Sequence, residues 1–439
     1  MQNLQFAKDK KFVGDIGDLI LDNKIIYFDS GLKLIHKQMQ GVRSVAIGVM
    51  VAVGSVSENE QNNGISHFIE HMMFKGTSKR SAFDIVCEID GLGAQVNAYT
   101  SKQSTCYYTI SVDEYAENCM EIMSDFLFNS TFDQVEMDKE KGVVLEEIAM
   151  SEDTPDDLCL ENLASAYYKG SNLGYTILGK AENIRNFKTA DLKDYINSRY
   201  SAGNMVISVV GNISEQKATE LVSKYFDKNV FKGGYKMQKQ SHTPKCDSVV
   251  TIKPLEQSNI AIAFPSLEFG AQNYMSLLAL NSAFGGGMSS RLFQEVREKS
   301  GLAYNVYSYP SAYYGDGVFS IYLGTNPKTT EQALRSIKQE IIKLKNNGLG
   351  EDELARVKKQ LKGNYALSQE SSAALMRVYG RNALFLDEYF DFDQKIAEID
   401  QITQDSVMEI INCIFDFDKV VTSYVGKEIN FDPLKIIKD

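Results

Sequence analysis

Closely spaced cysteines are missing from this chain. Its six cysteines are dispersed over 439 residues with no C-x-x-C pair. This spacing argues against a thiolate metal site and against a disulfide framework. We expect the cysteines to be small buried side chains in a reducing compartment. They are Cys87, Cys106, Cys119, Cys159, Cys246 and Cys413.

Long apolar runs and an excess of positive charge are also missing. No run approaches the roughly 18 apolar residues that a membrane span needs, and the opening residues 1–11 lack the apolar core of a signal peptide. We therefore expect a cytoplasmic protein that makes no contact with membranes. The net charge of −12 argues against a nucleic-acid partner, because such binding depends on clustered lysine and arginine.

Histidine is scarce, yet two of the four histidines lie close together. His67 and His71 are four residues apart, and Glu70 lies between them. On a helix these three side chains share one face. Two imidazoles at this spacing can bind one Zn²⁺ while the carboxylate lies beside an open coordination position, which is typical of a metallohydrolase. The alternative is a solvated helix face that carries two histidines and a glutamate.

The surrounding sequence favours the metal. The polar, turn-like segment 60–64 precedes a short helix that is apolar on much of its circumference and is predicted to end at Gly76. A buried imidazole or carboxylate without a partner is unfavourable, and a metal is one such partner. The apolar positions are Ile65, Phe68, Ile69, Met72, Met73 and Phe74.

Two histidines are too few for a zinc site, so a third ligand is expected. The segment 132–150 has a helical pattern, with acids early and apolar residues later. Glu140 and Glu147 lie seven residues apart and share one face of this helix. Glu146 is rotated by about 100° from Glu147, so one helix does not easily direct both at one ion.

These motifs resemble those of the M16, or pitrilysin-type, zinc peptidases, especially the bacterial members similar to processing peptidase (M16B). In that family, H-x-x-E-H is followed about 75 residues later by a glutamate ligand, and Glu147 occupies that position. The resemblance implies that His67, His71 and Glu147 bind one Zn²⁺ per chain and that Glu70 is the general base. It also makes Glu140 an essential carboxylate that orients a ligating histidine. The alternative for Glu140 is a solvated acid near a helix N-terminus.

Two further candidate sites come from the same resemblance. The segment 291–304 is similar to the second signature of the family, whose arginine and tyrosine reach the substrate; here they are Arg297 and Tyr304. Both can donate hydrogen bonds to the scissile carbonyl, although a surface arginine and a core tyrosine are the alternative. Asn97 and Ala98 match a strand edge that pairs with the substrate backbone in the family. An internal strand that ends in a turn is the alternative.

The two halves of the chain repeat one pattern. A hairpin at 25–35 and strands at 44–55 and 105–112 are matched by strands at 258–264 and 317–323, with a helix at 277–284. Leu92 then corresponds to Leu302, an offset of about 210 residues, which implies two domains of the same fold. We expect a catalytic zinc domain at 1–227, a polar linker at 228–245 and a substrate-binding domain at 246–439.

The mixture of hairpins and helices predicts α+β domains with largely antiparallel sheets. The resemblance implies the mitochondrial-processing-peptidase/LuxS-like metallohydrolase fold and a zinc metalloendopeptidase that cleaves short or unfolded peptides in an enclosed chamber. A chain with two such domains is expected to complete this chamber as a homodimer. The alternatives are a non-catalytic subunit of the same fold and one partner of a heterodimer.

Overall fold

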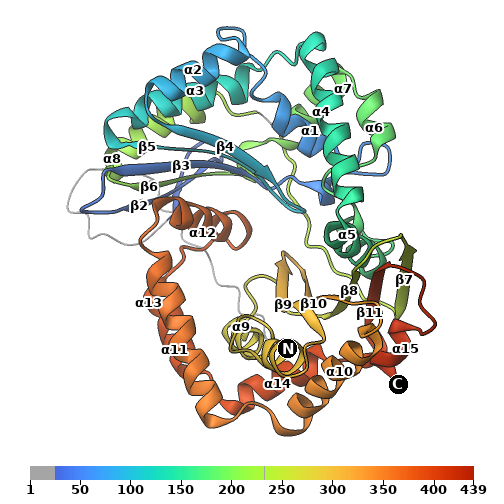
Figure 1. Cartoon of the computed structure of the whole chain (residues 1–439). Coiled ribbons are helices and arrows are strands. Elements are labelled where there is room, and N and C mark those ends of the chain that lie inside the picture. Colours follow the sequence, from blue (N-terminus) through green and yellow to red (C-terminus); the bar gives the residue numbers. More distant parts are fainter. Residues whose placement is uncertain (1–24, 232) are drawn as a thin grey trace, which may run out of the picture.

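Two β-sheets organise the protein. The computed structural model describes residues 25–231 and 233–439, and the opening segment 1–11 lies outside these residues. Figure 1 shows the two sheets in separate halves of the molecule, each with its own set of helices. Each sheet has its own hydrophobic core, so the fold contains two packed units.

The first sheet has six strands in the order β1-β2-β6-β3-β5-β4. The pair β2/β6 is parallel and the other neighbours are antiparallel. The central strand β3 is almost continuously apolar and buried, as expected for a strand covered on both faces. The strands are β1 (Ile25–Tyr27), β2 (Lys33–Gln38), β3 (Ser44–Val51), β4 (Gln95–Thr100), β5 (Thr105–Val112) and β6 (Met205–Gly211).

The second sheet has five strands in the order β7-β11-β8-β10-β9. Only β7/β11 is parallel, so this sheet repeats the order and direction of β2-β6-β3-β5-β4. This confirms the expected α+β class with two units of one fold. The strands are β7 (Asp247–Ile252), β8 (Ser258–Pro265), β9 (Ala303–Tyr313), β10 (Asp316–Thr325) and β11 (Val421–Gly426).

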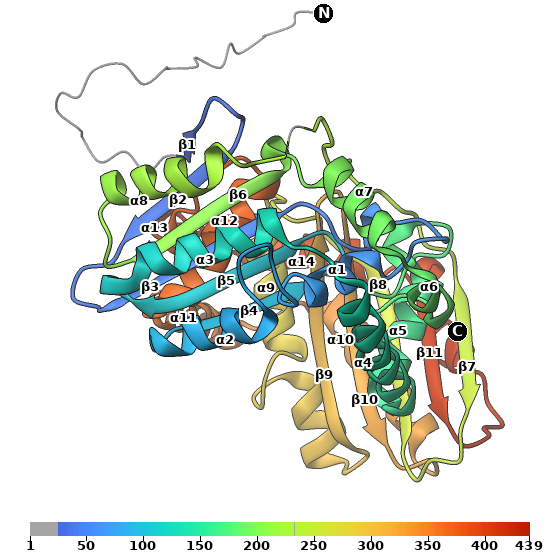
Figure 2. The ribbon, with the colours of Figure 1, turned by 90° about the horizontal axis from the view of Figure 1, so that it is seen from above.

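Helices cover both faces of the first sheet. Figure 2 shows α3 and α8 lying across its strands. The helices of the first half are α1 (Ile65–Met72), α2 (Ala82–Gly91), α3 (Ala116–Asn129), α4 (Gln134–Asp153), α5 (Pro155–Tyr167), α6 (Ala181–Asn186), α7 (Thr189–Arg199) and α8 (Glu215–Val222). Helix α1 ends at Met72, earlier than the predicted end at Gly76.

The second half has a similar set of helices around its sheet. They are α9 (Tyr274–Phe284), the π-helix η6 (Phe293–Lys299), α10 (Thr330–Asn347), α11 (Glu351–Ser368), α12 (Ser372–Phe385), α13 (Phe392–Gln401), α14 (Gln404–Ile414) and α15 (Pro433–Lys438). Short helical turns are η1 (Ser55–Ser57), η2 (Asp113–Tyr115), η3 (Asn172–Gly174), η4 (Ala202–Asn204), η5 (Ser223–Asp227) and η7 (Phe417–Lys419). No described helix combines the length and the apolar composition needed to cross a membrane.

The two halves exchange a helix. Helix α12 packs on β3 and β6 of the first sheet, on the face opposite α3 and α8 (Figure 1). A Cβ atom added at Gly48 would lie 2.2 Å from the sulfur of Met376, and one at Gly380 would lie 2.5 Å from the sulfur of Met50. These two reciprocal glycine–methionine contacts allow the helix to approach the sheet closely.

In the opposite direction, α5 packs on the second sheet. The Cys159 thiol on α5 is buried and donates to the carbonyl oxygen of Asn259 on β8 at 3.4 Å. The helix therefore forms part of the cover of a sheet from the other half.

The expectation that all cysteines are buried is wrong, because Cys87 and Cys413 are exposed.

Candidate metal centre

Helix α1 begins without a side-chain cap at its own N-terminal residue. Gly64 has a φ of 102° and offers no side chain. Instead, the carboxylate of Glu58 accepts hydrogen bonds from the backbone N–H groups of Gly64 at 2.8 Å and Ser66 at 2.9 Å. The Asn63 side-chain amide donates to the same carboxylate at 2.8 Å. Glu58 therefore fixes the start of the helix that carries the histidines.

The Glu58 carboxylate is almost fully enclosed, with 3% of its surface exposed. Burial raises its pKa, and the three hydrogen bonds act in the opposite direction. Sequence reasoning missed this residue, since Glu58 lies six positions before Gly64 and matches no common capping spacing. Its only sequence signal is an acid shortly before an uncapped helix.

Backbone contact at Gly64 also limits where α1 can lie. A Cβ atom added at Gly64 would lie 2.8 Å from the carbonyl oxygen of Leu178, and one at Gly179 would lie 2.3 Å from the Cα of Gly64. Both glycines have positive φ values, 102° and 79°. The segment before α6 therefore presses directly on the start of α1, which only glycine at both positions permits.

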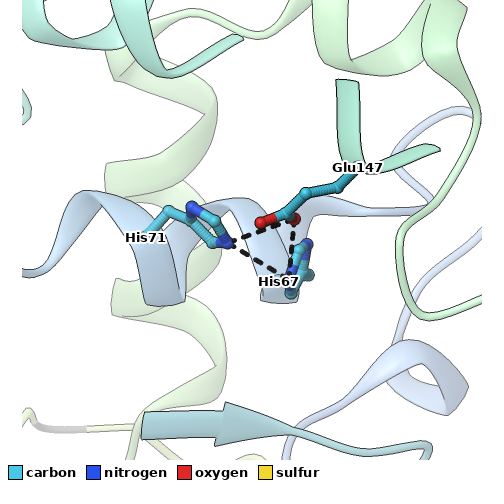
Figure 3. Close-up of side chains that lie close together, drawn as sticks. All are labelled: His67, His71 and Glu147. Atoms are coloured by element: carbon cyan, nitrogen blue, oxygen red, sulfur yellow. Dashed lines mark hydrogen bonds and ion pairs between the residues drawn. The ribbon is translucent and has the colours of Figure 1, made fainter. Parts of the chain in front are cut away.

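His67, His71 and Glu147 converge, although α1 and α4 are far apart in sequence (Figure 3). The two histidine Nε2 atoms are 3.2 Å apart. Glu147 Oε2 lies 3.8 Å from Nε2 of His67 and 3.6 Å from Nε2 of His71. These three residues are called the triad below.

The triad distances fit a zinc ion. Zn²⁺ binds nitrogen and oxygen ligands at about 2.0–2.2 Å in a tetrahedron, so two such donor atoms lie about 3.3–3.6 Å apart. The three measured separations lie at or near this range. The donor set of two imidazole nitrogens and one carboxylate oxygen is also one that zinc takes, with a fourth position left for water or substrate.

Helix α4 presents Glu147 and not Glu146 to the histidines. Its buried residues Val144 and Ile148 lie beside Glu147 on the packed side of the helix, whereas Glu146 is exposed. Asp133 caps the helix by accepting from the backbone N–H groups of Val135 and Glu136. The one-residue choice between the two glutamates thus follows from which face of α4 packs on α1.

Glu140 lies on the same face of α4 as Glu147, two turns earlier, and it contacts a histidine of the triad. Its Oε1 lies 2.8 Å from Nδ1 of His71, and its Oε2 lies 2.6 Å from Nζ of Lys75. Glu140 is 5% exposed, so it is not the solvated acid of the alternative interpretation. A hydrogen bond from Nδ1–H of His71 to Glu140 leaves Nε2 as the ligating atom.

Burial and charge act differently on the two imidazoles. Burial lowers the pKa of His67 to about 4, and the nearby His71 adds to this effect. Burial would also lower the pKa of His71, but its bond to Glu140 and the charge of Glu147 raise it overall. In Glu140 burial acts upward, yet His71 and Lys75 hold the pKa of its carboxyl below the usual range. His67 is therefore neutral at pH 7, the form that binds metals.

Glu70 lies on α1 beside the edge strand β4. Burial raises the pKa of its carboxyl, and the Thr100 hydroxyl donates a hydrogen bond to its Oε2. Strand β4 is the last strand of its sheet, so it has an open edge. Asn97 on this strand is exposed, and its side-chain oxygen accepts from the N–H of Ala98 at 2.8 Å. Asn97 and Ala98 thus lie on an edge strand and not on an internal one.

Arg297 and Tyr304 lie in the second half, on η6 and at the start of β9. The Arg297 guanidinium lies 5.0 Å from the centre of the Tyr304 ring and 4.7 Å from that of Phe293. Tyr304 is 71% exposed, so it is not a core tyrosine. Arg297 also lines a pocket of about 440 Å³ next to residues 285–288. Among the described residues, no hydrogen bond or ion pair joins Arg297 or Tyr304 to the triad.

Comparison with known proteins gives two family matches that together span most of the chain. Residues 33–181 match the family model described as Insulinase (Peptidase family M16). Residues 186–361 match the model described as Peptidase M16 inactive domain. The first match contains the triad, Glu70 and Glu140, and the second contains Arg297 and Tyr304.

Several curated bacterial proteins are similar over nearly their whole length. An uncharacterized zinc protease of Bacillus subtilis, YmxG, is 41% identical over 391 residues, which is 89% of this chain and 95% of that protein. An uncharacterized zinc protease of Streptomyces coelicolor is 34% identical over 87% of this chain and 84% of that protein. One from Rickettsia felis is 37% identical over 88% of this chain and 93% of that protein.

Two solved structures share the fold. The first, described as a peptidase M16 inactive domain from Pseudomonas fluorescens, has a TM-score of 0.88 at 22% identity and covers 94% of this chain and 100% of its own. The second is described as a protease from Helicobacter pylori, with a TM-score of 0.85 at 21% identity, covering 92% of this chain and 99% of its own.

Proposed function

The chain belongs to peptidase family M16, and on that premise we propose that it is a zinc-dependent endopeptidase whose site is formed by His67, His71 and Glu147 with Glu70 as general base. The observation that carries this proposal is the convergence of three donor atoms from two distant helices at separations that suit Zn²⁺. Its relatives named as zinc proteases support the same activity.

Each side chain has a specific task in this proposal. A bound Zn²⁺ would lower the pKa of water and polarise the scissile carbonyl. Glu70 takes a proton from the attacking water and delivers it to the leaving amine, so no covalent intermediate forms. Glu140 holds His71 through Nδ1, and the Lys75 ammonium balances the Glu140 charge. The proposal thus assigns the base to Glu70 and the metal ligands to His67, His71 and Glu147, with His71 oriented by Glu140.

The substrate is proposed to be a short or unfolded peptide. The open edge of β4 beside Glu70 supports pairing with an extended peptide backbone, which selects weakly for side chains. Arg297 and Tyr304 then donate hydrogen bonds to the scissile carbonyl oxygen when the two halves enclose the peptide. We propose a homodimer with one zinc site in each chain, and light scattering under assay conditions tests it: a monomer contradicts this assembly.

The decisive experiment combines metal analysis with peptide cleavage. Purified protein should contain about one zinc per chain and should cleave an unstructured peptide, and a chelator should abolish cleavage. Glu70→Gln should keep the zinc and lower kcat by about 10²- to 10⁴-fold, the usual contribution of a positioned acid–base group. Glu146→Gln, a change at an exposed glutamate, is the matched control and should leave both unchanged.

A non-catalytic subunit is the alternative. The match to the inactive domain covers 186–361, a range that excludes the triad and lies mostly in the second half of the chain. Protein that binds zinc in full yet cleaves none of a varied peptide set would favour this alternative. Activity equal to wild type in Glu70→Gln would remove Glu70 from its proposed role.

A further inference from the structure

The carboxylate of Glu70 is held by a residue from another element. Thr100 is the last residue of β4, and its hydroxyl donates a hydrogen bond to Glu70 Oε2. Both side chains are half-buried. Because the contact joins α1 to the edge strand across 30 residues of sequence, it depends on the tertiary fold and not on local helix geometry.

The hydroxyl hydrogen of Thr100 is committed to this bond. Its other hydroxyl neighbour, Thr105 Oγ1, lies 3.4 Å away and itself donates to the carbonyl oxygen of Val53 at 2.9 Å. A threonine hydroxyl has one hydrogen, so neither hydroxyl has a second one to give to the other. Thr105 therefore does not compete with Glu70 for the hydrogen of the Thr100 hydroxyl.

The bond also selects one carboxylate oxygen. Oε2 of Glu70 accepts from Thr100, and none of the described residues donates a hydrogen bond to Oε1. A side chain with several rotatable bonds, such as glutamate, loses rotamer freedom when it is held in one orientation. Holding that orientation before the substrate arrives favours proton transfer, because the base is already placed.

We propose that Thr100 is a positioning residue that orients the Glu70 carboxylate so that Oε1 faces the attacking water. This inference rests on the proposed peptidase function. The repeat offers an internal comparison: at the offset of 210 residues, Thr100 corresponds to Pro310 on β9, which has no hydroxyl. The hydroxyl is therefore found in the half that contains the triad.

The test uses zinc-loaded full-length protein and three variants. Thr100→Val removes the hydroxyl at nearly constant shape, and Thr100→Ser keeps it. Thr109→Val is the matched control, because Thr109 lies on the neighbouring strand β5 and its hydroxyl donates to the sulfur of Met123 and not to Glu70. Each variant is assayed for zinc content, thermal stability, kcat and KM.

Thr100→Val should lower kcat by about 10- to 100-fold, since a hydrogen bond to a charged group is lost. KM should change by less than about twofold and zinc should stay at one per chain, because only the base is disturbed. Thr100→Ser should recover most of kcat, and Thr109→Val should keep it. Equal loss in Thr100→Ser and Thr100→Val, or no loss in either, overturns the inference.

Crystal structures of wild type and Thr100→Val separate this inference from the proposed function. Glu70 should occupy one orientation in the wild type and a different or mixed one in Thr100→Val, whether or not the wild type cleaves peptides. An unchanged Glu70 orientation in Thr100→Val overturns the positioning role even if the enzyme is active. A wild type that binds zinc and cleaves nothing contradicts the proposed function instead.

Discussion

Each half of the molecule has its own sheet with the same strand order, but the two halves differ in one pair of helices. In the chain, helix α1 comes after β3 and before β4, and it contacts α4. In the second half, α9 comes after β8 and before β9, and it contacts α11. At the offset of 210 residues, His67, Glu70 and His71 correspond to Leu277, Leu280 and Asn281. The positions of the two histidines and the base in one half are thus largely apolar in the other.

A hydrogen bond between neutral groups joins the second helix pair. Leu277 and Leu280 are fully buried in the core of their half. Helices α1 and α4 bring two imidazoles and a carboxylate together. In the second half, the Ser282 hydroxyl on α9 instead donates to the Gln360 side chain on α11 at 3.0 Å. Both groups in this hydrogen bond are neutral, whereas the carboxylate of Glu147 faces the two imidazoles between α1 and α4.

The fold and the chemistry therefore have separate requirements. The fold needs an apolar helix face against the sheet, which both halves supply. The metal centre needs polar groups on a mostly buried helix, and these are unfavourable without partners. On α1 these partners are Glu58 at its start, Thr100 beside Glu70, and Glu140 with Lys75 near its end.

The largest effect is expected when a residue of the triad is removed. Glu147→Ala should abolish stoichiometric zinc binding, because two histidines alone do not complete the site. Glu146→Ala should keep about one zinc per chain, since this neighbouring glutamate is exposed. Metal analysis after dialysis measures both. If the outcomes are reversed, the ligand assignment is wrong by one residue.

A smaller effect tests what the second half contributes. Arg297→Ala should retain the zinc and lower kcat/KM by about 10²-fold, because one donor to the scissile carbonyl is lost. Arg335→Ala removes an exposed arginine of α10 that pairs with Glu331, and it should behave as wild type. Unchanged kcat/KM in Arg297→Ala would confine the chemistry to the first half.

The third prediction concerns Glu58, the cap of α1, and the stability of the fold. Glu58→Ala leaves the buried N–H groups of Gly64 and Ser66 without their acceptor, so the free energy of unfolding should fall by about 3 kcal/mol. Urea unfolding of the zinc-free protein measures this. Glu60→Ala, at an exposed acid paired with Lys180, should cause no measurable change. Equal effects of the two variants would remove the capping role.

The smallest effect is expected in the helix pair of the second half. Ser282→Ala removes the hydrogen bond to Gln360 and should lower the free energy of unfolding by about 1 kcal/mol or less. Zinc content should not change, and kcat should stay within twofold of wild type. A loss of zinc in this variant would show that the two helix pairs are coupled, which the comparison does not predict.

Much of the fold followed from local patterns. The strands predicted at 105–112 and 258–264 match β5 and β8 within one residue, and the predicted helix at 132–150 is α4 with small shifts at its ends. Alternating or continuous apolar runs are local signals, so they survive without tertiary information. The exchange of α5 and α12 had no such signal, because nothing in an amphipathic pattern says which sheet it covers.

The spacing of His67, Glu70 and His71 was enough to predict that they share a helix face, because the geometry of a helix fixes the positions of its side chains. The sequence also predicted that two similar units follow each other. The packing of α4 on α1 places Glu147, and not Glu146, next to the histidines, and tertiary contacts also cap α1 with Glu58 and bind Thr100 to Glu70. Those contacts join residues whose separation in sequence bears no fixed relation to their distance in space, so the packing of whole elements sets them.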